Sequence, residues 1–208
     1  MKKIVVKSLK IFGGAIAFLL VMMFLFPILF PGKIEKEVKQ FANNKLNGEL
    51  NFKEANLSFF NHFPSLTLSL NEFCLKGSAP FKKDTLLAAN EIAFGINLKT
   101  LIFDRKVTID KIFISDAFMN VKVNTNGEAN YNVYISDNKK TTTDTSSTSL
   151  RLDKISIKNT HLVYDDKSTK ILIEAKGFNY IGKGDLDQSI FDLKTEADIE
   201  DFNFAFGG

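Results

Sequence analysis

Residues 68–75 read LSLNEFCL. The stretch alternates apolar and polar residues, as a half-buried strand does, until the polar pair Asn71-Glu72 interrupts the alternation. The same arrangement recurs as LNFKEANL from Leu50, LAANEIAF from Leu87, VTIDKIFI from Val107, LRLDKISI from Leu150 and ADIEDFNF from Ala197. The first four copies begin 18, 19 and 20 residues apart. This spacing is typical of a hairpin with its turns, so the pattern predicts a mainly β fold.

The polar pair of each copy is either a two-residue hairpin turn or a β-bulge. Tight hairpin turns need positive φ and favour Gly or Asn-Gly, which Asn-Glu, Asp-Lys and Glu-Asp do not supply. A bulge keeps both apolar sets on one face and increases the twist of the sheet. The repeat therefore predicts a curled, largely antiparallel, bulged sheet that forms an open groove or half-barrel.

The sheet signals fall into two parts. Residues 49–135 form the first part, and residues 150–208 continue it. Between them, residues 136–149 read SDNKKTTTDTSSTS without one apolar residue, which predicts a flexible polar loop. The sequence ends within a strand signal at Phe206-Gly207-Gly208, and an unprotected apolar strand is a rare domain end. We therefore expect a fragment of a longer sheet.

Upstream of the sheet, Ile11–Phe30 reads IFGGAIAFLLVMMFLFPILF and contains no charged residue. In a helix it spans roughly 30 Å, the thickness of a bilayer's hydrocarbon core. A cleavable signal peptide has a shorter apolar core and small residues at its cleavage site, whereas a soluble core helix has a polar face. The run fits neither, so it predicts an uncleaved transmembrane helix after a tail of residues 1–10.

Residues 33–47 carry the periodicity of an amphipathic helix. Ile34, Val38 and Phe41 belong to its apolar face, and Glu35 and Lys39 form an i,i+4 pair on the other. Such a helix either lies on the bilayer or plugs one end of the sheet domain. We favour the plug, because a sheet with one apolar face needs a cover.

Composition and motifs indicate no catalytic chemistry. The net charge is only +3, without a basic stripe, which argues against nucleic-acid binding. Cys74 is the single cysteine, and His62 and His161 lack partners at metal-ligand spacing. Asp165-Asp166 fits a solvated turn better than an acid–base pair. We expect no enzyme, cofactor or metal site, unless a further carboxy-terminal part supplies one.

The predicted sheet has more apolar surface than its helix can cover. Roughly ten strands at about 4.8 Å spacing form a sheet about 45–50 Å wide, and one helix shields about two strands. The remainder must close on itself, pack on another sheet or contain apolar guests. The in-phase residues that we expect to hold acyl chains are Ile92, Phe94, Ile96, Leu98, Ile109, Ile112 and Ile114.

Several stretches match motifs of a known family. They are FPSLTL from Phe63, DTLLAA from Asp84, INLKTL from Ile96, residues 107–114 and NGEANY from Asn126. With the preceding helices, this layout resembles the amino-terminal region of the AsmA-like family of bacterial envelope proteins. Tyr131 departs from the family pattern, which often has Trp there. The resemblance implies a single-pass inner-membrane protein with a cytoplasmic amino terminus and a periplasmic sheet, related to bridge-like lipid-transfer proteins. Lysines near the two ends of the apolar run are tied in number, so charge favours this orientation only weakly.

Two functions follow from the sheet and the resemblance. In the first, the apolar groove handles or transfers phospholipids or other acyl-chain lipids from the inner membrane for outer-membrane homeostasis. In the alternative, the sheet packs on itself as an assembly scaffold and binds envelope protein partners. Labelling of one sheet face by lipid would separate the two.

Overall fold

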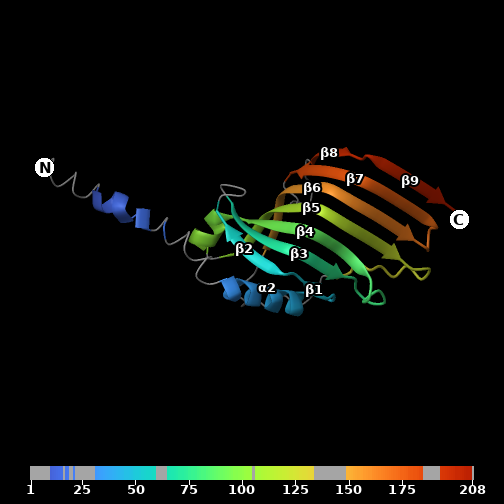
Figure 1. Cartoon of the computed structure of the whole chain (residues 1–208), viewed down its shortest axis with the longest axis horizontal. Helices are drawn as coiled ribbons and strands as arrows, with labels where there is room; N and C mark the ends of the chain where they lie inside the picture. Colours follow the sequence, from blue (N-terminus) through green and yellow to red (C-terminus); the bar gives the residue numbers. More distant parts are fainter. Residues whose placement is uncertain are drawn as a thin grey trace.

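The computed structural model describes residues 10–15, 17–18, 21, 31–59, 65–104, 106–133, 149–184 and 193–207. Nine strands form one sheet that curls without closing (Figure 1), which confirms the mainly β prediction. The strands are β1 (Leu50–Asn51), β2 (Glu54–Ser58), β3 (Leu66–Lys76), β4 (Thr85–Ile96), β5 (Thr108–Val123), β6 (Ser149–Asp166), β7 (Ile171–Lys183), β8 (Lys194–Asp198) and β9 (Asp201–Phe206). Their order is β1-β3-β4-β5-β6-β7-β8, with β2 also on β3 and β9 also on β7.

Neighbouring strands pair antiparallel except β5 and β6, which are parallel. A parallel pair needs a crossover, because the chain must return to the end where the first strand began. The return starts at a turn in which Gly127 has a φ of +79°. The buried Asn130 then donates to the carbonyl oxygen of Asn120 (2.6 Å) and accepts from the amide of Lys122 (2.9 Å). These bonds hold the start of the crossover against β5.

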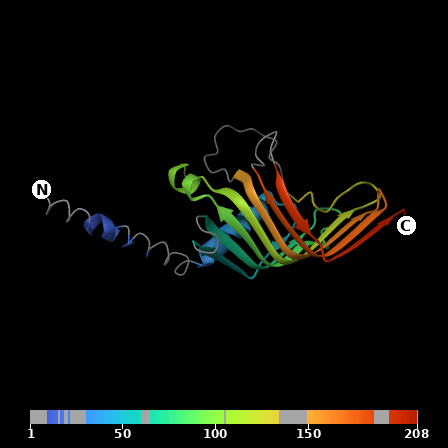
Figure 2. The same ribbon diagram turned by 90° about the horizontal axis from the view of Figure 1, so that it is seen from above.

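The long strands of the sheet bend partway along their length (Figure 2). A line of four polar residues and one glycine crosses the sheet through the places where the backbone departs from regular pairing. We call this line the crease; its members are Glu72, Asn90, Asp116, Asn159 and Gly177. All but Asn90 have positive φ, from 46° to 59°. On β3 and β4 the pairing passes from Asn71↔Glu91 directly to Phe73↔Ala89. The strands thus continue through the polar pair, which rules out a hairpin turn. The pair is not a β-bulge between β3 and β4 either, because one residue of each strand, Glu72 and Asn90, is passed over and the register is unchanged. The register shift between these strands lies between Leu75 and Lys76.

The alignment of the sequence repeat was wrong in two strands. The crease crosses β5 at Asp116 and β6 at Asn159, not at the polar pairs Asp110-Lys111 and Asp153-Lys154. Residues 112–119 (IFISDAFM) and 155–162 (ISIKNTHL) carry the same pattern and supply the crease. The earlier pairs instead lie at separate register shifts, between Gly95 and Ile96 and between Ile109 and Lys111.

Helix α2, Pro31–Lys45, is the predicted amphipathic helix and begins two residues before its predicted start. It lies against β1 and β2 (Figure 1). Val38 packs on the hydrophobic core, Lys39 forms the expected pair with Glu35, and the Lys39 Nζ lies 5.1 Å from the ring centroid of Phe52. The packing agrees with the plug interpretation, because α2 covers one edge of the sheet.

The predicted transmembrane segment Ile11–Phe30 lies mostly outside the described residues, as do the tail before Lys10 and residues 136–148 of the polar loop. The described positions within 11–21 are helical. Within the part of the chain that the structure describes, no helix is both long and apolar enough to cross a membrane. Membrane spanning therefore stays a prediction.

Candidate functional site

Six of the seven predicted lipid-contacting residues lie on one face of two neighbouring strands. The register pairs Ile92 with Ile114, Phe94 with Ile112, and Ile96 with Ile109. Partners in a ladder point to the same face, so these six residues share one side of the sheet, while their contact with lipid stays a prediction. We call this side of the sheet the apolar face.

Leu98 does not belong to this set. Strand β4 ends at Ile96, and the Asn97 Oδ1 accepts hydrogen bonds from the backbone amides of Lys99 (3.0 Å) and Thr100 (3.2 Å). An Asn side chain that caps its own backbone in this way starts a helical turn, here leading into η1, Thr100–Asp104. The alternating pattern therefore predicted a strand that continues to Leu98, two residues beyond the actual end of β4.

The apolar face continues across the whole sheet through the strand registers. One row joins Leu70, Ile92, Ile114, Ile157 and Tyr180. Beyond the crease, another row joins Leu75, Leu87, Met119, Leu162, Ala175 and Phe202. Two further rows end at Phe204 and Phe206 of β9, opposite Ile173 and Ile171. Because the crease shifts the alternation by one residue, both halves of every long strand contribute apolar side chains to this face.

Burial changes along the apolar face from one edge to the other. Near α2, Leu70 and Ile92 are 1% and 3% exposed and belong to the core cluster with Phe52. At the far edge, Phe202, Phe204 and Phe206 are 55%, 59% and 71% exposed. Among the predicted residues, Ile92, Ile96 and Ile114 are buried, and Phe94, Ile109 and Ile112 are half-buried. Ile92, Ile96 and Ile114 therefore belong to the hydrophobic core. The exposed part of the apolar face lies towards β9.

Sequence reasoning missed this open part. The phenylalanines at 202, 204 and 206 alternate cleanly within the last repeat copy and the residues after it, which is the signal that could have found them. The half-buried rings of Phe178 and Tyr180 stack nearby on β7 with centroids 6.3 Å apart. Aromatic side chains thus supply much of the apolar surface on β7 and β9.

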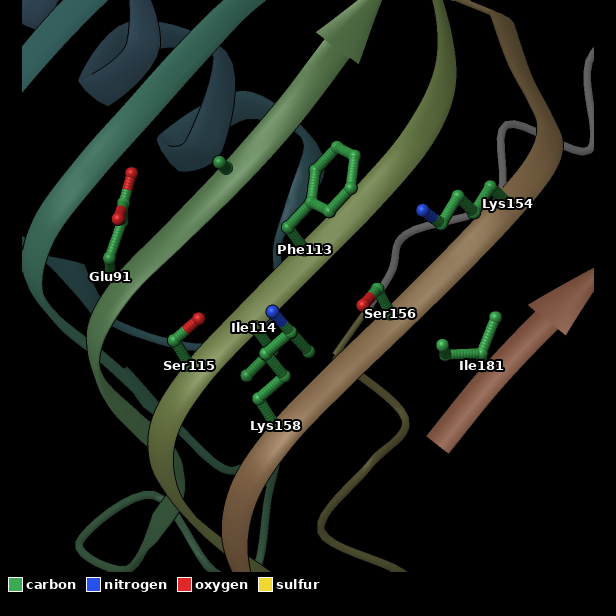
Figure 3. A pocket seen from close by; sticks show the side chains of 9 residues that line it. Glu91, Phe113, Ile114, Ser115, Lys154, Ser156, Lys158 and Ile181 are labelled. Carbon is green, nitrogen blue, oxygen red and sulfur yellow. The ribbon is translucent and has the colours of Figure 1, made fainter. Parts of the chain in front are cut away.

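The opposite face has different chemistry. A shallow pocket of about 380 Å³ lies over β4 to β7 and combines charged, hydroxyl and apolar side chains (Figure 3). The Lys154 Nζ lies 5.4 Å from the ring centroid of Phe113, and Ser115 and Ser156 lie alongside. An acyl chain would have to desolvate these polar groups, whereas the rows through Ile92 and Leu87 on the apolar face carry almost only apolar side chains. The two sides of the sheet are therefore not equivalent binding surfaces.

The titratable groups form structural contacts. His161 and Glu174 both lie on the face opposite the apolar face, with 2.8 Å between the His161 Nε2 and the Glu174 Oε1. The His161 ring packs on Phe118. Hydrogen bonds from the Ser168 hydroxyl and from turn amides hold the pKa of Asp166 below its ordinary value. Asp166 is buried at the end of β6, beside the turn, so the predicted solvated turn at Asp165-Asp166 was wrong in its placement and its exposure. Among the described residues, no group of three or more His, Cys, Asp or Glu could hold a metal ion.

Comparison with known proteins gives one match. The family model described as the AsmA family matches residues 1–181. Comparisons with curated proteins and with solved structures find no match. The family match spans α2, η1, the strands β1 to β6 and most of β7. Because it covers most of the 208 residues, the chain belongs to the AsmA family, and this membership supports an envelope-associated protein.

Proposed function

We propose that this chain is an inner-membrane protein of the bacterial envelope that holds and transfers lipid acyl chains along its apolar face. The run Ile11–Phe30 anchors it, the amino terminus lies in the cytoplasm, and the sheet lies in the periplasm. Its partners are phospholipids or other acyl-chain lipids, and its role is non-catalytic. Family membership supports the envelope location.

The observation that carries the proposal is the exposed row Phe202, Phe204 and Phe206 at the open edge of a continuous apolar face. Soluble proteins rarely leave contiguous apolar patches open unless the patch binds something. A surface of this kind attracts any acyl chain, because burial of each methylene contributes about 0.8 kcal/mol. Headgroups would stay in water beside the open edge, so the surface would tolerate different lipids.

Such a surface also allows movement. The rows of the apolar face consist mainly of ring and aliphatic side chains, and an acyl chain has no hydrogen bond to break when it shifts along them. A lipid could therefore slide between equivalent positions along the rows. The crease would not interrupt the path, because apolar residues lie on the same face on both sides of it.

The test uses photo-crosslinking in membranes with the full chain. A benzoylphenylalanine replaces Phe204 in one variant, and Asn203 or Ala205 in matched controls. All three positions are exposed on β9, but only Phe204 lies on the apolar face. We expect phospholipid adducts at Phe204 and far fewer at the two controls.

The alternative is an assembly scaffold, and strand β9, which pairs only with β7 among the described strands, supports it. An edge strand presents unpaired backbone groups to which another protein can add a strand. Under this alternative, the probe at Phe204 captures protein and no lipid, or lipid labels all three positions equally. Either result would reject lipid handling by the apolar face.

A further inference from the structure

The connection between β4 and β5 exposes large apolar side chains at one end of the sheet. Within η1, Ile102 is 61% exposed and Phe103 is 77% exposed. The connection is held in shape, because the Asn97 side chain caps its start and the Lys106 amide donates to the Thr100 carbonyl oxygen at 3.1 Å. The two apolar residues therefore sit on an ordered projection, which we call the η1 tip.

Lysines surround the η1 tip. Lys99 and Lys106 are exposed on either side of it. A transverse row of lysines follows on the opposite face, because the register pairs Lys111 with Lys154, Lys154 with Lys183, and Lys183 with Lys194. Among the residues that the structure describes, Asp104, Asp110 and Asp153 are carboxylates at this end. This end of the sheet is thus apolar at its tip and basic around it, a combination that suits an anionic lipid surface.

The η1 tip and the start of α2 lie at the same end of the molecule (Figure 1). The register agrees: α2 leads into β1, which pairs with Cys74 and Leu75 near the far end of β3. Helix α2 is 15 residues long, or about 22 Å, so it reaches back towards the end where β4 finishes. Pro31, its first residue, directly follows the apolar run of Ile11–Phe30.

We propose that Ile102 and Phe103 insert into the interface of the bilayer that holds the anchor, while the surrounding lysines contact lipid phosphates. This inference rests on the anchor of the proposed function and adds a second membrane contact to it. Phe94, Ile96 and Ile109 lie on the apolar face just behind the η1 tip. Docking of the tip would place that end of the apolar face at the bilayer surface, where an acyl chain could leave the leaflet.

The experiment measures the depth of the η1 tip in vesicles of phosphatidylethanolamine and phosphatidylglycerol. The full chain carries Cys74→Ser and an environment-sensitive NBD label on Phe103→Cys. The matched control carries the label on Asn126→Cys, an exposed turn residue at the opposite end of β5. With spin-labelled acyl chains in the vesicles, we expect about half of the emission to be quenched at position 103 and less than about a tenth at position 126.

A charge reversal provides the second arm. Lys99→Glu with Lys106→Glu should reduce quenching at position 103 by about twofold or more in anionic vesicles, because the basic surround is removed. Lys82→Glu with Lys83→Glu makes the same charge change on exposed residues between β3 and β4, at the far end, and should leave quenching unchanged. Equal effects of the two pairs would show general charge attraction and reject the local contact.

Other outcomes separate this inference from the proposed function. A blue-shifted emission at position 103 without lipid quenching would place the η1 tip against protein and overturn the inference. Equal, weak quenching at both positions in vesicle-bound protein would also overturn it, while leaving the anchor intact. Failure of the unlabelled protein to stay with vesicles after carbonate extraction would reject the anchor and both proposals with it.

Discussion

The two edges of the apolar face have the same chemistry but opposite environments. At the β2–β3 edge, Leu70 is 1% exposed beneath the side of the sheet that α2 covers. At the β7–β9 edge, Phe204 is 59% exposed and belongs to the same face. One alternating pattern therefore produces a hydrophobic core where a helix covers it and an open surface where none of the described elements does. The two parts of the face differ in whether α2 covers them, and not in their composition. The covered part stabilises the fold, and the uncovered part is available for binding.

The largest expected contrast comes from truncation of one side chain at each edge. Leu70→Ala should lower the free energy of unfolding by about 2–5 kcal/mol, because it leaves a cavity in a packed core. Phe204→Ala should cost about 1 kcal/mol or less, because most of that ring already faces solvent. Chemical denaturation of the full chain in detergent, followed by circular dichroism, measures both changes.

Lipid capture should depend more on Phe204, which affects stability less, than on Leu70. Phe204→Ala should reduce lipid crosslinking from a probe at Phe202, its neighbour on the same face of β9. Ile199→Ala is a matched control, because Ile199 is also exposed but lies between β8 and β9 rather than within either strand. A large loss of stability in Phe204→Ala would show that the β9 edge is packed like the β3 edge, and the contrast would fail.

A smaller effect is expected at the crease, which joins the two edges. Gly177 has a φ of +59°, a region that costs most L-residues roughly 1–2 kcal/mol. An added Cβ would also overlap with the Glu200 side chain, which must then move. Gly177→Ala should therefore lower the free energy of unfolding by about 1–2 kcal/mol and reduce lipid capture at Phe204, through a shift of β7 against β9.

Gly127→Ala is the control for this change. Gly127 also has a positive φ, +79°, but its added Cβ would meet no atom within 4 Å, and the residue lies in the turn after β5. It should lose a similar amount of stability and keep full lipid capture. If the two variants lose lipid capture equally, the crease has no special role in positioning β9.

The sequence was sufficient to predict the sheet, its curl and the face shared by Phe94 and Ile112, because period-two alternation survives in each strand segment. It was insufficient to place the bend in β5 and β6. Each of these strands contains two polar pairs that match the repeat. Only the pairing with neighbouring strands, which aligns Asp116 and Asn159 with Glu72 and Asn90, shows which pair lies at the bend. Local patterns carry no information about which pairs become neighbours across a sheet.

The division of the site into buried and open parts also required the structure. Ile92 and Phe204 are both apolar residues in alternating strands, and nothing local distinguishes the buried position from the exposed one. Their difference follows from where α2 docks. The end of β4 was misjudged for a related reason: Leu98 continues the alternation, but the side chain of Asn97 caps the backbone and stops the strand first.

The smallest predicted effect concerns the pH dependence of stability at Asp110 on β5. Asp110 lies buried at the register shift between β4 and β5; its Oδ2 accepts a 3.3 Å hydrogen bond from the Asn97 Nδ2, and its Oδ1 has no partner among the described groups. Burial raises the pKa of this carboxyl above its ordinary value of 3.8. The folded state therefore binds the proton more tightly than the unfolded state, and the protein loses stability as the pH rises from 3.8 through the raised pKa.

Asp110→Asn removes this ionisation while keeping the shape of the side chain and an oxygen that can accept from Asn97. The variant should gain stability relative to the parent as the pH rises from about 4 to 7, and the two should differ least at the acid end. Asp104→Asn, in exposed η1, removes the same charge without burial and should show no such pH-dependent gain. Denaturation curves of the three proteins across this pH range provide the measurement. A gain that is constant with pH would mean that packing around position 110, and not the cost of burying a charge, accounts for the difference in stability.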